Sequence, residues 1–288
     1  MMPAIPLREL ATARWAQVRV ERPEAEPALP LHQALISTQL SLLEDDGLRV
    51  AAVHDPPTTE RVLEHLGAGL RAIDRPPAPP GVAFEAMHDL ARVLADHGAG
   101  HAASKIGSAL SSSAGPLAFD ASCLRDVDAM RALAQQHGLN LQVLWLIAEV
   151  ASAPVMHLRQ RVVLEESGEA VRDAVAAWQR GTCPACGAWP VVAEFFYGER
   201  LNRCSYCASM WPVPPGICTY CGETGEAFQT IVPDRNRPGR RLELCRTCGG
   251  YLKTLDVGRP TPFPLLAVED FATNDLDRAA QHHGFRRR

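Results

Sequence analysis

The stretch "GTCPACGAWP" at residues 181–190 contains the first of four cysteine pairs in which two residues separate the two cysteines. The other pairs are "CSYC" at 204–207, "CTYC" at 218–221 and "CRTC" at 245–248, so eight of the nine cysteines lie in this region. Such a pair can form a knuckle, a tight turn that points both sulfurs at one metal ion. Because a tetrahedral site needs four sulfurs, four knuckles predict two metal sites.

The residues between the knuckles predict how the pairs combine. "VVAEFFY" and "RLNRC" form a plausible hairpin between the first two knuckles, with a turn at Gly198 and Glu199. "EAFQTIV" and "RRLELC" form another between the last two. Knuckle, hairpin and knuckle in this order are typical of a zinc ribbon or rubredoxin-like module. The predicted ligands are Cys183, Cys186, Cys204 and Cys207 in the first site, and Cys218, Cys221, Cys245 and Cys248 in the second.

The spacing leaves one alternative open, in which the first pair combines with the third and the second with the fourth. No histidine lies between Cys183 and Cys248, so both sites are expected to be all-sulfur. Four thiolates suit zinc and equally suit a single rubredoxin-type iron. They leave no open position for a water ligand, which argues against hydrolytic chemistry. Glycine follows three of the four knuckles, as the positive φ of such turns favours.

Helical periodicity dominates the rest of the chain. Apolar residues recur at helical spacing in several segments, and these are 31–46, 58–73, 83–98, 123–138, 141–153, 164–180 and the tail 265–285. The proline-rich residues 75–81 are expected to form an exposed connection. The predicted class is α+β: a mostly helical domain over 1–180, two ribbons over 181–212 and 213–260, and a C-terminal helix and tail over 261–288.

Composition narrows the class of protein. The chain has 29 Lys and Arg against 33 Asp and Glu, a net charge of −4, which does not favour a nucleic-acid-coating protein. The N-terminus lacks the apolar core of a secretory signal, and the apolar segment 139–156 is interrupted by polar residues. We therefore expect a cytoplasmic protein without membrane insertion, in which thiols stay reduced and bind metal rather than form disulfides.

The order of motifs resembles a known family. "CSYCASMWPVPPGICTYCG" at 204–222, "ELCRTCGGYLKTLD" at 243–256 and "VEDFATNDLDRAAQHHGF" at 268–285 carry the resemblance. They are similar to the formate dehydrogenase accessory protein family, FdhE, over roughly residues 165–285. The resemblance implies a maturation factor that is not an enzyme and that binds the catalytic subunit of formate dehydrogenase. It also implies that the eight paired cysteines are ligands of iron or zinc.

Three further residues are candidate partner contacts: Trp211, Tyr251 and Lys253. A structural interpretation stands beside each, because Trp211 can cover a sulfur cluster and residues 251–253 can close the second ribbon as a strand. Cys123 is expected to be buried, and the terminal "RRR" at 286–288 to be solvated. The arginine-rich residues 234–241 are expected to form a solvated hairpin tip.

Two other functions compete with assembly of an enzyme. One is a nucleic-acid-binding zinc ribbon, which the nine basic against seven acidic residues between Gly181 and Pro260 do not favour. The other is one-electron transfer by a rubredoxin-like iron site.

Overall fold

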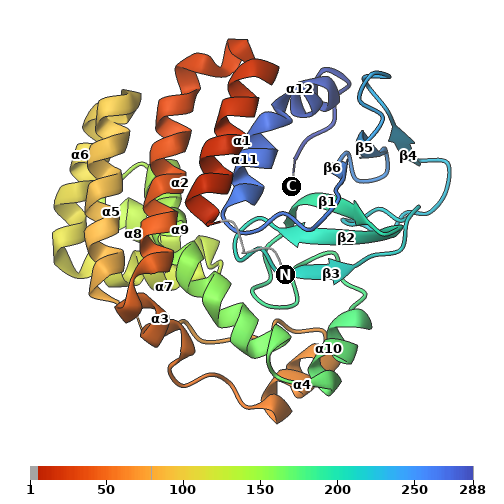
Figure 1. The fold of residues 1–288 in the computed structure, drawn as a ribbon. Helices are drawn as coiled ribbons and strands as arrows, with labels where there is room; N and C mark the ends of the chain where they lie inside the picture. Colours follow the sequence, from red (N-terminus) through yellow and green to blue (C-terminus); the bar gives the residue numbers. More distant parts are fainter. Residues whose placement is uncertain (1–5, 79, 288) are drawn as a thin grey trace. The chain divides into compact units, whose positions relative to one another are not determined.

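The computed structural model describes residues 6–78 and 80–287 (Figure 1). The chain divides into two units. The first holds the described residues of Met1–Pro56 and Ile73–Val162, and the second those of Pro57–Ala72 and Val163–Arg288.

The first unit is helical. Its elements are α1 (Leu7–Glu21), η1 (Pro23–Ala28), α2 (Leu29–Glu44), α3 (Asp46–Val53), α5 (Gly81–Leu94), η2 (Ala95–Ala99), α6 (Gly100–Ala109), η3 (Leu110–Ala114), α7 (Gly115–Cys123), α8 (Val127–His137) and α9 (Leu141–Gln160). Helix α9 contacts α2, α3, α5, α6, α7 and α8, so it forms the centre of this unit. Asp45, Asp126 and Asn140 cap α3, α8 and α9 by accepting a backbone N–H, which satisfies one of the free donors at each helix start.

Helix α9 continues into η4 (Arg161–Glu165). The combined run Leu141–Glu165 has a mean hydropathy of 1.4 over its most apolar window, which by length and composition is enough to cross a membrane. In the structure, 56% of that window is buried. The central helix of a soluble domain passes the same test. The buried Arg159 side chain of α9 donates to the carbonyl oxygens of Ala52, His54 and Asp55 and so ties α9 to the end of α3.

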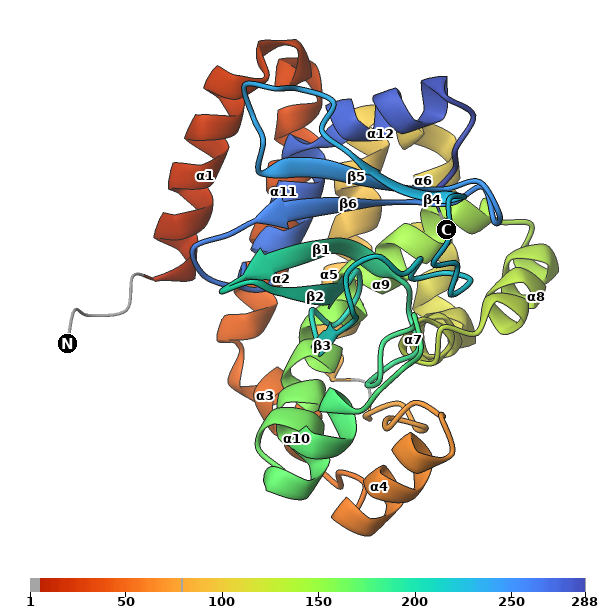
Figure 2. The same cartoon turned by 90° about the vertical axis from the view of Figure 1, so that its right-hand side faces the viewer.

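The second unit holds helices α4 (Thr59–Gly67), α10 (Glu169–Ala176), α11 (Leu265–Ala272) and α12 (Asn274–His282). Its strands are β1 (Pro190–Phe196), β2 (Glu199–Cys204), β3 (Met210–Pro212), β4 (Phe228–Ile231), β5 (Arg240–Cys245) and β6 (Tyr251–Asp256). They form one sheet with the order β3-β2-β1-β6-β5-β4 (Figure 2). Each half is antiparallel, and the halves join through the parallel pair β1 and β6.

The sheet topology sorts the connections between its two ends. All four cysteine knuckles lie at one end of the sheet. They come before β1, after β2, before β4, and between β5 and β6. The turn between β1 and β2, the loop between β4 and β5, and the end of β6 lie at the other end, since Phe195 pairs with Asp256 and Leu255 with Arg240. We call these the knuckle end and the tip end of the sheet.

One face of the sheet is covered by the last two helices. Leu242, Leu244 and Tyr251 form an apolar cluster with Leu276 and Ala280 of α12. Burial of apolar side chains of this size contributes about 1.5–3 kcal/mol each, so this cluster fixes α12 on the strands.

The predicted fold class is confirmed: a mostly helical N-terminal part precedes two ribbon modules. Several boundaries differ. The helix expected at 58–73 ends at Gly67, and the one expected at 123–138 begins at Val127. The tail forms two helices, and α1, α3, α6 and α7 lie mostly or wholly outside the segments in which helical spacing was recognised. Cys123 is buried as predicted. The domain boundaries at 180, 212 and 260 stay predictions.

A buried ion pair joins the two halves of the sheet. Arg200 of β2 donates from Nε and Nη2 to the two carboxylate oxygens of Glu243 of β5, at 2.7 and 2.5 Å. The side chains are 0% and 4% exposed. Arg200 also donates to Thr219, which lies in the third knuckle. A second buried pair, Arg203 with Glu194, lies within the first half. Breaking one partner of such a pair leaves an uncompensated buried charge.

We expect the substitution Glu243→Gln to lower the free energy of unfolding by about 3–5 kcal/mol, because the Arg200 guanidinium would stay buried without its counter-charge. Urea denaturation measures this. Arg8 and Glu44 form an equally bidentate pair in the first unit that is 44% and 57% exposed. The matched change Glu44→Gln should therefore cost no more than about 1 kcal/mol. Equal urea midpoints for the two variants would contradict the importance of the buried pair.

Candidate metal centre

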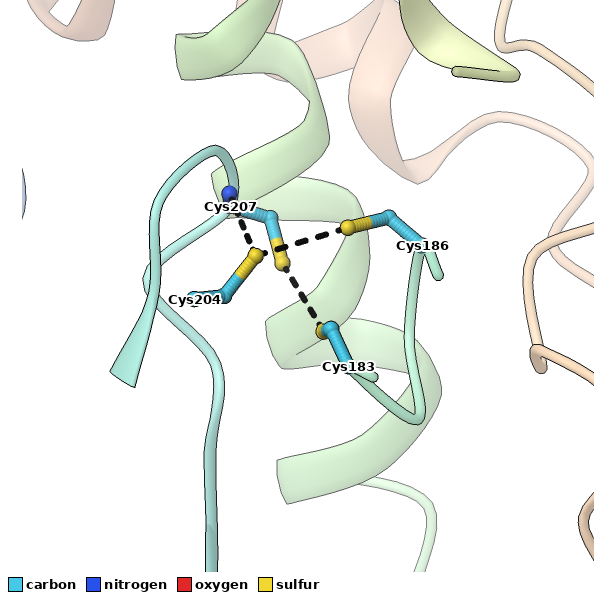
Figure 3. Close-up of side chains that lie close together, drawn as sticks. All are labelled: Cys183, Cys186, Cys204 and Cys207. Carbon is cyan, nitrogen blue, oxygen red and sulfur yellow. Dashed lines mark hydrogen bonds between the residues drawn. The ribbon is translucent and has the colours of Figure 1, made fainter. Parts of the chain in front are cut away.

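The structure brings the first four predicted ligands together (Figure 3). The Sγ atoms of Cys183 and Cys207 lie 3.7 Å apart, and those of Cys186 and Cys204 lie 3.5 Å apart. All four sulfurs lie within 4.8 Å of one another, and all four residues are buried. Backbone N–H groups of Tyr206 and Cys207 donate to the Cys204 sulfur at 3.4 Å. We call this group tetrad 1.

The last four cysteines form tetrad 2 in the same way. The Sγ atoms of Cys218 and Cys248 are 3.8 Å apart, and those of Cys221 and Cys245 are 3.6 Å apart. The structure thus adopts the sequential pairing of knuckles and not the crossed one.

The sulfur spacing fits a tetrahedral metal site. Four sulfurs at about 2.3 Å from one ion lie about 3.8 Å from each other, close to the spacing in both tetrads. A disulfide would instead place two sulfurs at about 2.05 Å, and all eight cysteines are free thiols. Both tetrads could therefore hold a metal ion. The all-sulfur donor set suits zinc and suits iron, and it does not select between them.

The four knuckles share one backbone pattern. In each, the first cysteine donates its N–H to the carbonyl oxygen five residues later, at 2.8–3.0 Å. The residue directly after the second cysteine has positive φ in every knuckle: 79° at Gly187, 59° at Ala208, 77° at Gly222 and 68° at Gly249. Glycine adopts this conformation freely, whereas an L-residue such as Ala208 is strained by about 1 kcal/mol.

The tetrads differ in their access to solvent. Every cysteine of tetrad 1 is buried, whereas Cys221 of tetrad 2 is exposed and Cys248 is half-buried. A reagent from solvent can therefore reach sulfur in tetrad 2 without any opening of the fold. In tetrad 1 it cannot.

Burial also sets the protonation of the thiols in the absence of an ion. It raises the pKa of Cys183 and Cys207 well above the ordinary value, and raises that of Cys218 in tetrad 2. Burial acts on Cys204 as well, but hydrogen bonds from the other three thiols outweigh it and lower the pKa of Cys204. Metal binding must then displace protons, so metal affinity falls as the pH falls.

The three candidate partner contacts are all buried. Trp211 is 1% exposed, Tyr251 2% and Lys253 1%. Lys253 forms ion pairs with Asp270 and Asp277, and the Tyr251 hydroxyl donates to Asp277. These contacts favour the structural interpretation, in which residues 251–253 close the second ribbon as part of β6. A partner role for the three stays a prediction.

Two sets of contacts near tetrad 2 were missed from the sequence, those of Tyr220 and those of the C-terminal tail. The Tyr220 hydroxyl donates to the carbonyl oxygen of Tyr251, and its ring lies 5.3 Å from that of Trp189, which links the third knuckle to both ribbons. Arg286 and Arg287 are exposed, as expected for a solvated tail, but both also contact the sheet. Nothing in the local sequence signals either contact, because the partners are distant along the chain.

The backbone of the tail pairs with the residues that follow the fourth knuckle. The Arg286 N–H donates to the carbonyl oxygen of Gly249, and Arg286 accepts from the N–H of Tyr251. Arg287 forms an ion pair with Asp270 and donates to the carbonyl oxygen of Val191 in β1. Residue 288 lies outside the described residues.

Two four-cysteine modules in one sheet, in a chain that also holds a helical unit, define a protein with tandem zinc-ribbon modules. No family model matches the chain. Among curated proteins it is similar to the FdhE homolog of Aquifex aeolicus (29% identical over 113 residues, 38% of this chain and 40% of that protein). It is also similar to Protein FdhE of Escherichia coli O127:H6 (30% over 113 residues, 38% and 36%) and to the FdhE homolog of Rhizobium meliloti (32% over 103 residues, 34% and 33%).

The chain thus matches less than half the length of these curated relatives. A solved structure extends the likeness of the fold: the crystal structure of the FdhE protein from Pseudomonas aeruginosa, with a TM-score of 0.59 and 23% identity. That match covers 96% of this chain and 91% of the other. The comparisons confirm the resemblance to the FdhE family that the cysteine motifs indicate.

We expect exchanges of glycine and alanine directly after the knuckles to change stability in opposite directions, because the Gly→Ala exchange adds backbone strain and the Ala→Gly exchange removes it. Gly222→Ala and Gly249→Ala add a Cβ that meets no atom within 4 Å, so only the positive φ is penalised, by about 1 kcal/mol. Ala208→Gly relieves the same strain and should leave stability unchanged or slightly higher. Gly258→Ala, equally open but without positive φ, is the matched control. Thermal unfolding measures all four, and a shared sign for positions 208 and 222 would contradict the prediction.

We expect metal to leave in two phases when a mercurial thiol reagent is added, with tetrad 2 releasing its ion first because Cys221 is exposed. A chromogenic indicator records the release. Cys221→Ser should remove the fast phase and Cys183→Ser the slow one. Lowering the pH from about 8 to about 5 should weaken binding at both tetrads, because protons compete for the thiolates. Release in one phase, or from tetrad 1 first, would contradict this order.

Proposed function

We propose that this chain is a cytoplasmic accessory protein that binds the catalytic subunit of a formate dehydrogenase and assists its maturation. It does so without catalysing a reaction itself. The observation that carries the proposal is the similarity to FdhE proteins, by sequence over about a third of the chain and by fold over 96% of it.

The role that fits the two tetrads is structural. When bound, a zinc or iron ion would hold four thiolates and so fix two knuckles at a defined distance. Structural sites of this kind contribute apparent binding energies of about 10–16 kcal/mol, which small ribbons with little core of their own require. Tetrad 1 would fix the start of β1 to the end of β2, and tetrad 2 would fix the third knuckle to the end of β5. The sheet then forms a rigid platform for recognition.

One observation supports a second candidate, one-electron transfer. Cys221 and Cys248 bring tetrad 2 to the solvent, where an electron could reach a bound iron ion. A visible absorption spectrum together with metal analysis separates the two roles. Iron with a rubredoxin-like spectrum would support electron transfer as a role, and stoichiometric zinc without colour would exclude it.

The proposal predicts that the chain, tagged at its N-terminus, retains the catalytic subunit of the host formate dehydrogenase from a native lysate. It also predicts that a strain without the gene loses most formate dehydrogenase activity. Complementation with the parent chain should restore the activity. Cys183→Ser should not restore it, because tetrad 1 would be incomplete.

Cys123→Ser is the matched control, since Cys123 is buried outside both tetrads. It should complement like the parent chain. Full formate dehydrogenase activity in the strain without the gene would contradict the proposed function.

A further inference from the structure

The tip end of the sheet carries a residue that local folding does not explain. Tyr197 and Gly198 form the two-residue turn between the paired residues Phe196 and Glu199, one position earlier than the sequence predicts. Their φ angles are 49° and 83°, so both residues are left-handed. Asn-Gly is the sequence that such a hairpin turn favours. A bulky L-residue at the first position is strained by about 1 kcal/mol.

Burial does not compensate for this strain. Tyr197 is 90% exposed, and its ring contacts that of Phe196 with 4.3 Å between centroids. The position therefore presents a large aromatic side chain to solvent at a point where asparagine would be more stable. Strained residues that the fold does not need are found preferentially at functional sites.

The same end of the sheet also carries several arginines. Arg241 lies 4.6 Å over the ring of Phe195, beside the tip, and pairs with Asp256. Arg235 and Arg259 are exposed in the neighbouring loops. A hollow at the same end is lined by Arg237 and Arg240 and also by the acidic residues Asp256 and Glu269. Figure 2 shows β1, β6 and β5 side by side, with the arrowheads of β1 and β6 pointing the same way, toward the tip end.

The two ends of the sheet differ in charge. The tip segments 197–199, 232–241 and 256–259 contain five arginines against Glu199, Asp234 and Asp256, a net charge of five minus three, or +2. The knuckle segments 181–189, 205–209, 218–227 and 246–250 contain one arginine against two glutamates, and Arg286 and Arg287 of the tail bring this end to three minus two, or +1 before any thiolate is counted. In a chain with a net charge of −4, the tip is thus a local positive region.

From these observations we infer that the tip end is a docking surface for an acidic segment of the client protein, with an apolar pocket that receives Tyr197. Tyrosine and arginine are the residue types that dominate binding energy at protein interfaces. Complementary charge adds orientation and a faster association rate. The inference rests on the proposed function and adds to it the end of the sheet that contacts the client.

The test uses the full chain with both metal ions and the isolated catalytic subunit of the host formate dehydrogenase, with affinity measured by calorimetry. Tyr197→Asn separates binding from folding, because it should raise thermal stability and yet weaken binding by about tenfold or more. The double change Arg235→Glu and Arg259→Glu should weaken binding and reduce its salt dependence. Arg246→Glu at the exposed knuckle end, which makes half the charge change of the double variant (−2 against −4), is the control and should bind like the parent chain.

Parent-like binding by both tip variants would overturn the docking inference and leave the proposed function intact. Weaker binding by Arg246→Glu alone would place the contact at the knuckle end and also overturn it. If the parent chain binds no catalytic subunit, the proposed function fails, and this inference fails with it. Salt-dependent binding of duplex DNA that the double change abolishes would identify phosphate as the ligand of the tip and overturn the inference.

Discussion

The clustering of sulfur is the constraint on which the rest of the second unit depends. Each tetrad holds four thiols with paired sulfurs 3.5–3.8 Å apart, and tetrad 1 is fully buried. Four thiolates at that distance in a low-dielectric site would repel each other, so without an ion most of these thiols stay protonated, and a bound cation would allow all four to be thiolates. Since the knuckles lie next to the strands at the same end of the sheet, ions bound in the two tetrads would also fix where the strands begin.

A second level of organisation joins the modules to each other. The parallel pair β1 and β6 makes one sheet from two ribbons, and the Arg200–Glu243 ion pair connects β2 with β5 on one face. On the opposite face, Lys253 reaches Asp270 and Asp277, which ties β6 to the C-terminal helices. Two ribbons that each have little core therefore share one, with a charged pair buried on either side of the sheet.

The cysteine spacing was enough to predict the tetrads and the hairpins, because ligand spacing and turn geometry are local properties. The register of β1 on β6 could not be predicted in this way, since its residues lie about 60 positions apart. The same holds for Tyr220 and Arg286, whose contacts depend on how the knuckles meet. For Lys253 the sequence left a partner contact and a strand position both open, and only the structure shows the two aspartates from α11 and α12 that accompany its burial. Helix α1 escaped detection because only Ala11, Trp15 and Val18 are buried along it.

The discontinuity of the second unit has a consequence for synthesis on the ribosome. Helix α4 and the residues after it belong to that unit: α4 contacts α10, and the Ala72 N–H donates to the carbonyl oxygen of Pro184 in the first knuckle. The 90 residues 73–162 are translated in between. At roughly 5–20 residues per second, α4 and the residues that follow it wait about 5–20 s for their contacts. During that interval its apolar stripe, with Val62 and Leu66, is available to a nascent-chain-binding factor.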